Sequence, residues 1–331
     1  MPRKSFPYTK TEATPQARQF VANLTQLQVT DGVLTPVQAA VWKESLRGLI
    51  EQGAPAVPAI REFLEKNLDI NFEGLENGSL MGASTLRSAL LSAMMQIGGD
   101  EAVGTALEVL QTTADPAELA LLAKKLDGSD ASPYHDAILN AAREALHLAA
   151  SGQWDGRDVG PLIDILVNYG GAASVGDLEI YANTWFNYTP LALAAMPDGT
   201  GIHSLIQLAE NNGGSVTLGR DMYQRALAQS AQQYPEAADA LLQLLQRGRI
   251  DVSAWPGIAA ALGGATLQIQ SAPISGKPAT STDAAQKTYH VAIGNQNYYE
   301  LPPGGTMTAE EVQSRISLID RLLAATSNPA A

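Results

Sequence analysis

One stretch of the chain decides the predicted fold: Met94-Met95-Gln96-Ile97-Gly98-Gly99-Asp100-Glu101-Ala102-Val103. Its first residues end an apolar segment with helical spacing, in which Leu86, Leu90 and Met94 recur every fourth position. The two glycines favour the left-handed backbone conformation that ends many helices. A small and an aliphatic residue then open a second apolar segment. The stretch therefore predicts two helices joined by a short turn.

The same order of features returns at residues 49–64, 163–178 and 193–206. Each copy has an apolar helix end, a turn with Gly, and an aliphatic residue that opens the next helix. Recurrence of such a unit is typical of repeat proteins, in which each unit packs only on its neighbours. If the copies are equivalent, Val103, Val175 and Ile202 share one structural position, and we expect all three to be buried.

The repeated turn resembles the HEAT-repeat pattern I-G-D-x-x-A-V-x-x-L. The resemblance covers residues 35–262 and implies an all-α fold, a solenoid of stacked helical hairpins. A compact helical bundle is the alternative. The whole chain also resembles uncharacterised bacterial helical-repeat proteins that are exported or membrane-anchored, which implies export but supplies no activity.

Helix starts are marked by a capping residue followed by proline, which is tolerated at the first helical position because its missing N–H has no intrahelical partner there. The pattern predicts helices that open at these pairs: Thr14-Pro15, Thr35-Pro36, Asp115-Pro116, Ser132-Pro133 and Thr189-Pro190. Alanine and leucine dominate the composition, and only 6% of residues are aromatic. Both favour helices over strands.

Residues 265–306 break the helical pattern. Residues 266–270 and 288–293 alternate with period two, which predicts two strands of a β-hairpin joined by a long, mobile loop. We therefore divide the chain into a flexible segment at 1–14, a helical-repeat domain at 15–264, the hairpin insertion at 265–306 and a C-terminal helix at 307–331, packed on the repeats. A cap-and-proline pattern at residues 326–329 predicts that the native chain continues.

Length and charge limit the function classes. The 331 residues exceed the size of one ordinary core, which indicates two domains or an elongated array. The net charge is −13, and the 21 basic residues are scattered, so a nucleic-acid partner is not expected. No apolar run is long enough to insert into a membrane. The absence of cysteine favours a periplasmic or secreted location, with a leader that this chain lacks; a cytoplasmic location is the alternative.

The sequence shows no catalytic, cofactor-binding or metal-binding constellation. The histidines, His135, His147, His203 and His290, lack the spacing of a helical metal site. Carboxylate pairs such as Glu101 with Glu108 and Asp115 with Glu118 are interpreted as solvated helix faces. The Asn-x-Ser/Thr triplets at Asn23, Asn77 and Asn187 carry little weight, because such triplets are common by chance.

An aromatic cluster at Trp185, Phe186 and Tyr188 has two interpretations. The rings fill the core between repeats, or they form a partner-binding patch, since aromatic side chains are frequent interface anchors. Trp154 and the pair Tyr298-Tyr299 pose the same question. The favoured function is a non-enzymatic scaffold that binds a protein or peptide. The alternative is a ligand-binding or enzymatic protein with its site between the helices and the C-terminal insertion.

The sequence predicts no binding of metal ions or nucleotides. Thermal unfolding in the presence of Zn²⁺, Ca²⁺, ATP or NAD should leave the midpoint unchanged, because no residues are predicted to hold any of them. A ligand at 100 times its dissociation constant would stabilise the fold by about 2.7 kcal/mol. A reproducible rise of several degrees with any one of the four would contradict this prediction.

Overall fold

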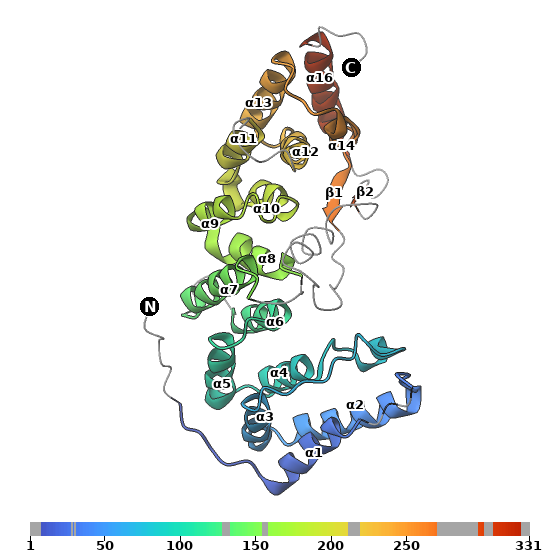
Figure 1. Ribbon diagram of the computed structural model, residues 1–331, viewed down its shortest axis with the longest axis vertical. Coiled ribbons are helices and arrows are strands. Elements are labelled where there is room, and N and C mark those ends of the chain that lie inside the picture. Colours follow the sequence, from blue (N-terminus) through green and yellow to red (C-terminus); the bar gives the residue numbers. More distant parts are fainter. Residues whose placement is uncertain are drawn as a thin grey trace. The chain divides into compact units, whose positions relative to one another are not determined.

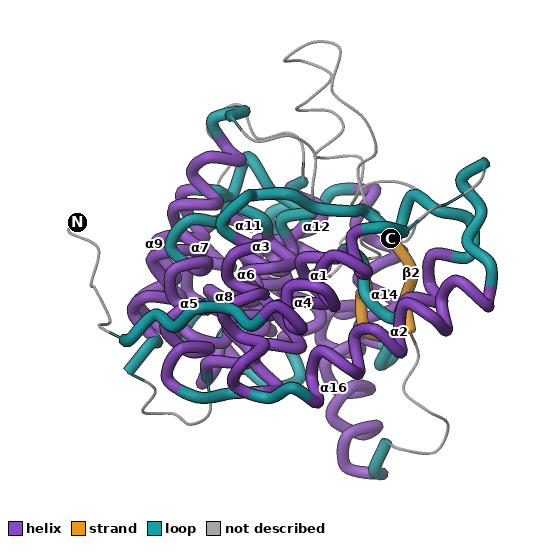
Figure 2. The backbone as a smooth tube through the Cα atoms, turned by 90° about the horizontal axis from the view of Figure 1, so that it is seen from below, coloured by secondary structure: helices purple, strands orange, loops and turns teal. Residues whose placement is uncertain are grey.

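The computed structural model describes residues 8–27, 29, 31–127, 133–153, 158–210, 219–269, 297–300 and 307–325. The fold is all-helical: α-helices and short 3-10 turns make up almost all of its regular structure (Figures 1 and 2). The chain divides into two compact units, Met1–Ala141 and Ala142–Ala331. The division falls inside helix α7, His135–Ala150.

The remaining elements follow one another along the chain. The first unit contains α1 (Pro15–Thr25), α2 (Pro36–Glu51), η1 (Ala54–Ala56), α3 (Val57–Leu64), η2 (Gly78–Met81), α4 (Leu86–Ile97), α5 (Asp100–Leu110) and α6 (Pro116–Leu126). The second unit contains α8 (Gly160–Gly170), η3 (Gly171–Ser174), α9 (Val175–Ile180), α10 (Tyr188–Ala195), η4 (Pro197–Gly199), α11 (Ile202–Glu210), α12 (Arg220–Ser230), α13 (Pro235–Gln246), η5 (Val252–Ala254), α14 (Trp255–Leu262) and α16 (Ala309–Ala325).

Three of the predicted proline starts are confirmed. Thr14 and Thr35 accept hydrogen bonds from the backbone at Ala17 and Gln38, and Asp115 caps α6 in the same way. The helix predicted at Thr189-Pro190 is present, but Thr189 does not cap it. Helix α10 begins at Tyr188, because the Thr189 N–H already donates to the Trp185 carbonyl at 2.9 Å. The preceding turn thus supplies the bond that a capping side chain would otherwise make.

Helices of the first unit pack on near neighbours in the chain. Helix α3 contacts α1, α4 and α5, and α4 contacts α2, α5 and α6 (Figure 1). The core between them includes Ile60, Leu90 and Met94, all fully buried. The long connection from α3 to α4 folds back onto α2, where the rings of Phe72 and Trp42 meet edge to face with centroids 5.3 Å apart.

Helices of the second unit follow the same rule. Helix α10 contacts α8, α9, α11 and α12, and α12 contacts α11, α13 and α14. Helix α16 packs on α13 through Leu318 and Leu322. Near-neighbour packing in both units means that each helix is buried by segments one or two helices away in the sequence.

Two short strands lie near the C-terminus. Strand β1 (Thr266–Ile269) pairs antiparallel with β2 (Asn297–Glu300), with Thr266 opposite Glu300. Strand β1 lies within the predicted segment 266–270. The predicted second strand, 288–293, lies outside the described residues. Strand β2 occupies a segment that the sequence analysis did not assign to a strand.

The flexible segment predicted over 1–14 stays a prediction: residues 1–7 lie outside the described chain, and residues 8–14 form a non-helical segment. We call residues 8–14 the strap. The strap runs along α5, where the Thr11 hydroxyl donates to Glu101 at 2.6 Å and the Lys10 ammonium to Glu108 at 3.0 Å. Sequence reasoning missed these contacts because their partners lie about 90 residues away.

The predicted equivalence of three aliphatic residues is wrong. Ile202 is buried, whereas Val103 and Val175 are only partly buried. In their helices, Ala102 and Leu178 are buried instead. Turns of different length rotate the following helix by different amounts, so the first aliphatic residue does not always face the core.

This difference generates a prediction within the second unit. Ile202→Ala should lower the free energy of unfolding by about 2–4 kcal/mol, because it leaves a cavity in a packed core. Val175→Ala should lower it by about 1 kcal/mol or less, because less apolar surface is lost at a partly exposed position. Urea unfolding followed by circular dichroism measures both. Equal losses would contradict the burial difference.

Candidate functional site

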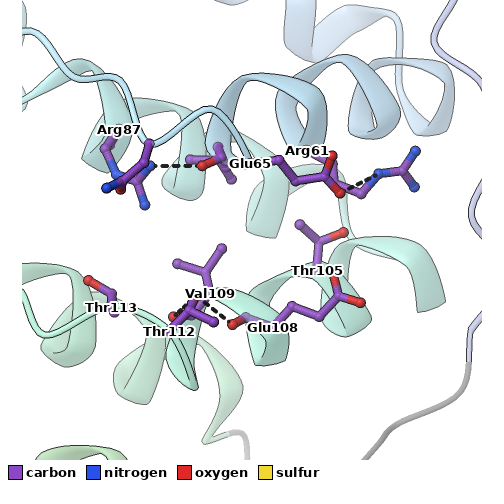
Figure 3. Close-up of a pocket in the computed structure, with 10 residues that line it drawn as sticks. Arg61, Glu65, Arg87, Thr105, Glu108, Val109, Thr112 and Thr113 are labelled. Carbon is purple, nitrogen blue, oxygen red and sulfur yellow. Dashed lines mark hydrogen bonds and ion pairs between the residues drawn. The ribbon is translucent and has the colours of Figure 1, made fainter.

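A cavity of about 380 Å³ lies in the first unit, beside α3 and α5 (Figure 3). Its walls mix charged, hydroxyl and aliphatic side chains. They come from α3, the connection that follows it, α4, α5 and the turn after α5: Arg61, Leu64, Glu65, Asn67, Arg87, Thr105, Glu108, Val109, Thr112 and Thr113. Figure 3 shows Arg61 and Arg87 on one side and Thr105 and Glu108 on the other.

All three guanidinium nitrogens of Arg87 donate hydrogen bonds within the chain. Nε and Nη2 donate to the two carboxylate oxygens of Glu118 at 2.6 and 3.2 Å, and Nη1 donates to the Leu64 carbonyl at 3.0 Å. Thr113 adds a hydroxyl donor to Glu118 at 2.8 Å. Arg87 and Glu118 are only 8% and 4% exposed. A charged pair this deeply buried is tolerated because nearly every polar atom has a partner.

Arg61 forms a second buried centre at the other end of the cavity. Its Nη1 bonds the carboxylate of Glu101, and its Nη2 donates to the Thr11 carbonyl of the strap at 2.9 Å. Its Nε lies 3.6 Å from Glu65. Arg61 therefore connects α3, α5 and the strap.

These pairs correct the interpretation of Glu101 and Glu118 as solvated, whereas Glu108 is exposed as predicted. Glu118 is buried against Arg87, and the side chain of Glu101 is 15% exposed beside Arg61. The sequence did contain a clue. Arg61 and Arg87 lie in the apolar stripes of their helices, three residues before Leu64 and Leu90. A charged residue inside an apolar stripe requires a buried partner.

The rim of the cavity is acidic and holds a lysine. The Lys10 ammonium lies 3.0 Å from Glu108 and 3.5 Å from Glu65, so it bridges two helices. The hydrogen bond to Glu108 raises the pKa of Lys10, against a smaller lowering by desolvation. The site can thus hold an ammonium group between two carboxylates, while both arginines are already bonded to partners within the chain.

The aromatic cluster lies in the second unit. The rings of Trp185 and Phe186 are buried. Trp185 is 1% and Phe186 5% exposed, so neither is a surface anchor. Trp185 packs on Tyr181 with ring centroids 4.7 Å apart. Tyr188 is partly buried, and its hydroxyl bonds Asp158. The rings of Trp185 and Phe186 thus belong to the core of the second unit.

The other residues singled out from the sequence are dispersed. Within the described residues no three His, Asp or Glu side chains gather closely enough to hold a metal ion. His203 bonds Gln207 one turn along α11, at 2.9 Å. Trp154 and His290 lie outside the described residues, and so do the side chains of Tyr298 and Tyr299. In the part of the chain that is described, no helix is both long and apolar enough to cross a membrane.

No protein-family model, curated protein or solved structure matches the chain.

The buried ion pair generates a stability prediction. Glu118→Ala should lower the free energy of unfolding by about 3–5 kcal/mol, because it leaves Arg87 buried without its counter-charge. The matched control is Glu44→Ala, which breaks the exposed Glu44–Arg47 pair at 2.8 Å and should change stability by about 0.5 kcal/mol or less. Urea unfolding of both variants measures the difference.

A double variant separates charge from packing. Arg87→Met with Glu118→Leu should recover most of the stability lost in Glu118→Ala, since apolar side chains of similar volume replace a buried ion pair well. A double variant as unstable as Glu118→Ala would show that the loss comes from packing rather than from an unpaired charge.

Proposed function

We propose that the chain is a non-enzymatic scaffold that presents an extended, HEAT-like helical-repeat surface to a protein or peptide partner. In such solenoids each helical hairpin packs on its neighbours, and the stacked units offer one long surface.

Contacts between alternate helices support the repeat arrangement. Helix α1 contacts α3, α2 contacts α4, α3 contacts α5, and α4 contacts α6; in the second unit α8 contacts α10 and α11 contacts α13. This is the pattern expected when hairpins stack and each helix lies beside its equivalent in the next hairpin. The antiparallel pairing of β1 and β2 supports a small β-hairpin insertion at 265–306 in the same arrangement.

Polar bonds join alternate helices too. They link α1 with α3 through Arg18 and Glu62 at 2.7 Å, α7 with α9 through Arg143 and Asp177 at 2.8 Å, and α9 with α11 through Glu179 and Ser204 at 2.5 Å. Side-chain bonds at several pairs of alternate helices favour stacked units over an irregular bundle.

One observation carries the peptide-binding part of the proposal. The strap is a non-helical segment of the chain that lies on α5 and is held by side chains of α3 and α5. The helical surface is thus complementary to at least one extended segment. Binding extended chains is what an elongated array of hairpins does well, because its surface is long and continuous.

The cavity favours the alternative, a ligand-binding protein. Its volume of about 380 Å³ lies in the range of small-molecule pockets. Its residues lie between positions 61 and 113, in the first unit, rather than beside the C-terminal insertion. The scaffold is preferred because both arginines in the wall are bonded within the chain.

Affinity capture from the native source tests the scaffold, with the full chain as bait. The captured partner, once purified, should slow amide hydrogen exchange over several consecutive helices of the bait. Protection of α3 and α5 alone, by a small amine rather than by a protein, would support the alternative instead. If no purified partner binds the full chain, the scaffold proposal is wrong.

A further inference from the structure

We propose that the face of α5 that carries Glu101, Thr105 and Glu108, with Glu65 beside it, binds an extended basic segment of a partner protein, and that the strap is its resident competitor. We call this face the acidic groove. The inference rests on the proposed scaffold function and adds the chemistry of the partner.

The acidic groove presents its side chains in a row. Glu101, Thr105 and Glu108 are spaced by four and three residues, so they lie on one side of α5. Each meets one residue of the strap: Glu101 bonds Thr11, the Thr105 hydroxyl lies 3.4 Å from the Tyr8 hydroxyl, and Glu108 bonds Lys10. The contacts thus extend over two turns of the helix.

Glycine at position 104 adapts α5 to the strap. A Cβ atom there would lie 2.0 Å from a ring carbon of Tyr8, closer than any packed contact. Glycine is unfavourable inside a helix, and α5 has no kink or end at this position that would call for it. The close approach of the tyrosine ring accounts for the residue.

Two side chains, of Glu101 and Arg61, form hydrogen bonds with the backbone of the strap. Glu101 accepts from the Thr11 N–H at 3.1 Å, and Arg61 donates to the Thr11 carbonyl at 2.9 Å. Both polar groups of one residue are therefore satisfied from the helices. Any extended segment can offer the same two groups, so this pair of bonds is not specific to the strap.

The basic character of the partner follows from charge complementarity. Glu65 and Glu108 place two carboxylates around a single ammonium, at 3.5 and 3.0 Å from Lys10. A segment with lysine one residue before the backbone-bound position fits this arrangement. An acidic segment would place like charges together, which disfavours binding.

The ion pair between the strap and Glu108 is exposed. The side chains of Lys10 and Glu108 are each 47% exposed, and ion pairs so exposed contribute little to stability. A tethered segment nevertheless competes at an effective concentration of about 1 mM. For a peptide with a dissociation constant of about 100 µM, such competition weakens apparent binding roughly tenfold.

Fluorescence anisotropy tests the inference with a labelled, N-acetylated peptide of residues 8–14, Tyr-Thr-Lys-Thr-Glu-Ala-Thr, and the full-length chain. The variant Lys10→Glu with Thr11→Pro removes the ammonium and the N–H that hold the strap. It should bind the peptide at least about tenfold more tightly than the wild type does. Lys43→Glu, at an exposed position on α2, reverses the same charge elsewhere and should bind like the wild type.

Two further arms identify the groove and the charge. Adding Glu108→Gln to the open variant should weaken binding about two- to fivefold, because the ion pair it removes is exposed. Replacing the peptide lysine by glutamate should weaken binding further, because it places like charges together. Circular dichroism confirms that every variant keeps its helices. An open variant that binds the peptide no better than the wild type overturns the inference, and so does equal binding of the lysine and glutamate peptides.

The two proposals fail in different ways. If the acidic groove does not bind peptides but a purified partner protects consecutive helices elsewhere, only the inference is wrong. If the groove binds the peptide but no partner binds the full chain, the groove chemistry stands and the scaffold function is wrong.

Discussion

The buried pair of Arg87 and Glu118 constrains how α4 packs on α6, and it is the most demanding of the charged bonds between alternate helices. Burial removes both groups from water at a large cost, which is offset only when each polar atom finds a partner at the right distance. Glu118 therefore requires α6 to lie where its carboxylate reaches Arg87 on α4 and the hydroxyl of Thr113. Apolar packing tolerates small shifts between helices, but this set of bonds does not.

The same constraint shapes the surface beside the cavity. Arg61 is buried in α3 and needs partners on two sides, which Glu101 and the backbone of Thr11 supply. The strap thus supplies a hydrogen-bond acceptor that the buried Arg61 needs. In the proposal above it also occupies a surface that binds extended segments. In the proposed binding of a partner segment the same side chains would be used, and a partner that takes the strap's place must supply the carbonyl that Arg61 loses.

The sequence predicted the class of fold because its signals are local. Proline after a capping residue and glycine after an apolar stripe act within one turn of helix, so α1, α2 and α6 begin where the chain itself specifies. A local signal was misleading where the preceding turn already supplied the hydrogen bond that a capping side chain would have made. The start of α10 moved to Tyr188 because the turn at Trp185 already supplied a carbonyl acceptor.

The sequence by itself determined that the chain is helical, where α1, α2 and α6 begin, and that the chain contains no cysteine. Only the tertiary structure decided which charges are buried, that Trp185 belongs to the core, and that the strap lies on α5. The physical reason is separation along the chain. Arg61 and Glu101 are 40 residues apart, and Lys10 and Glu108 are 98 apart. A helical period reveals which face of a helix is buried, but it does not say what lies against that face.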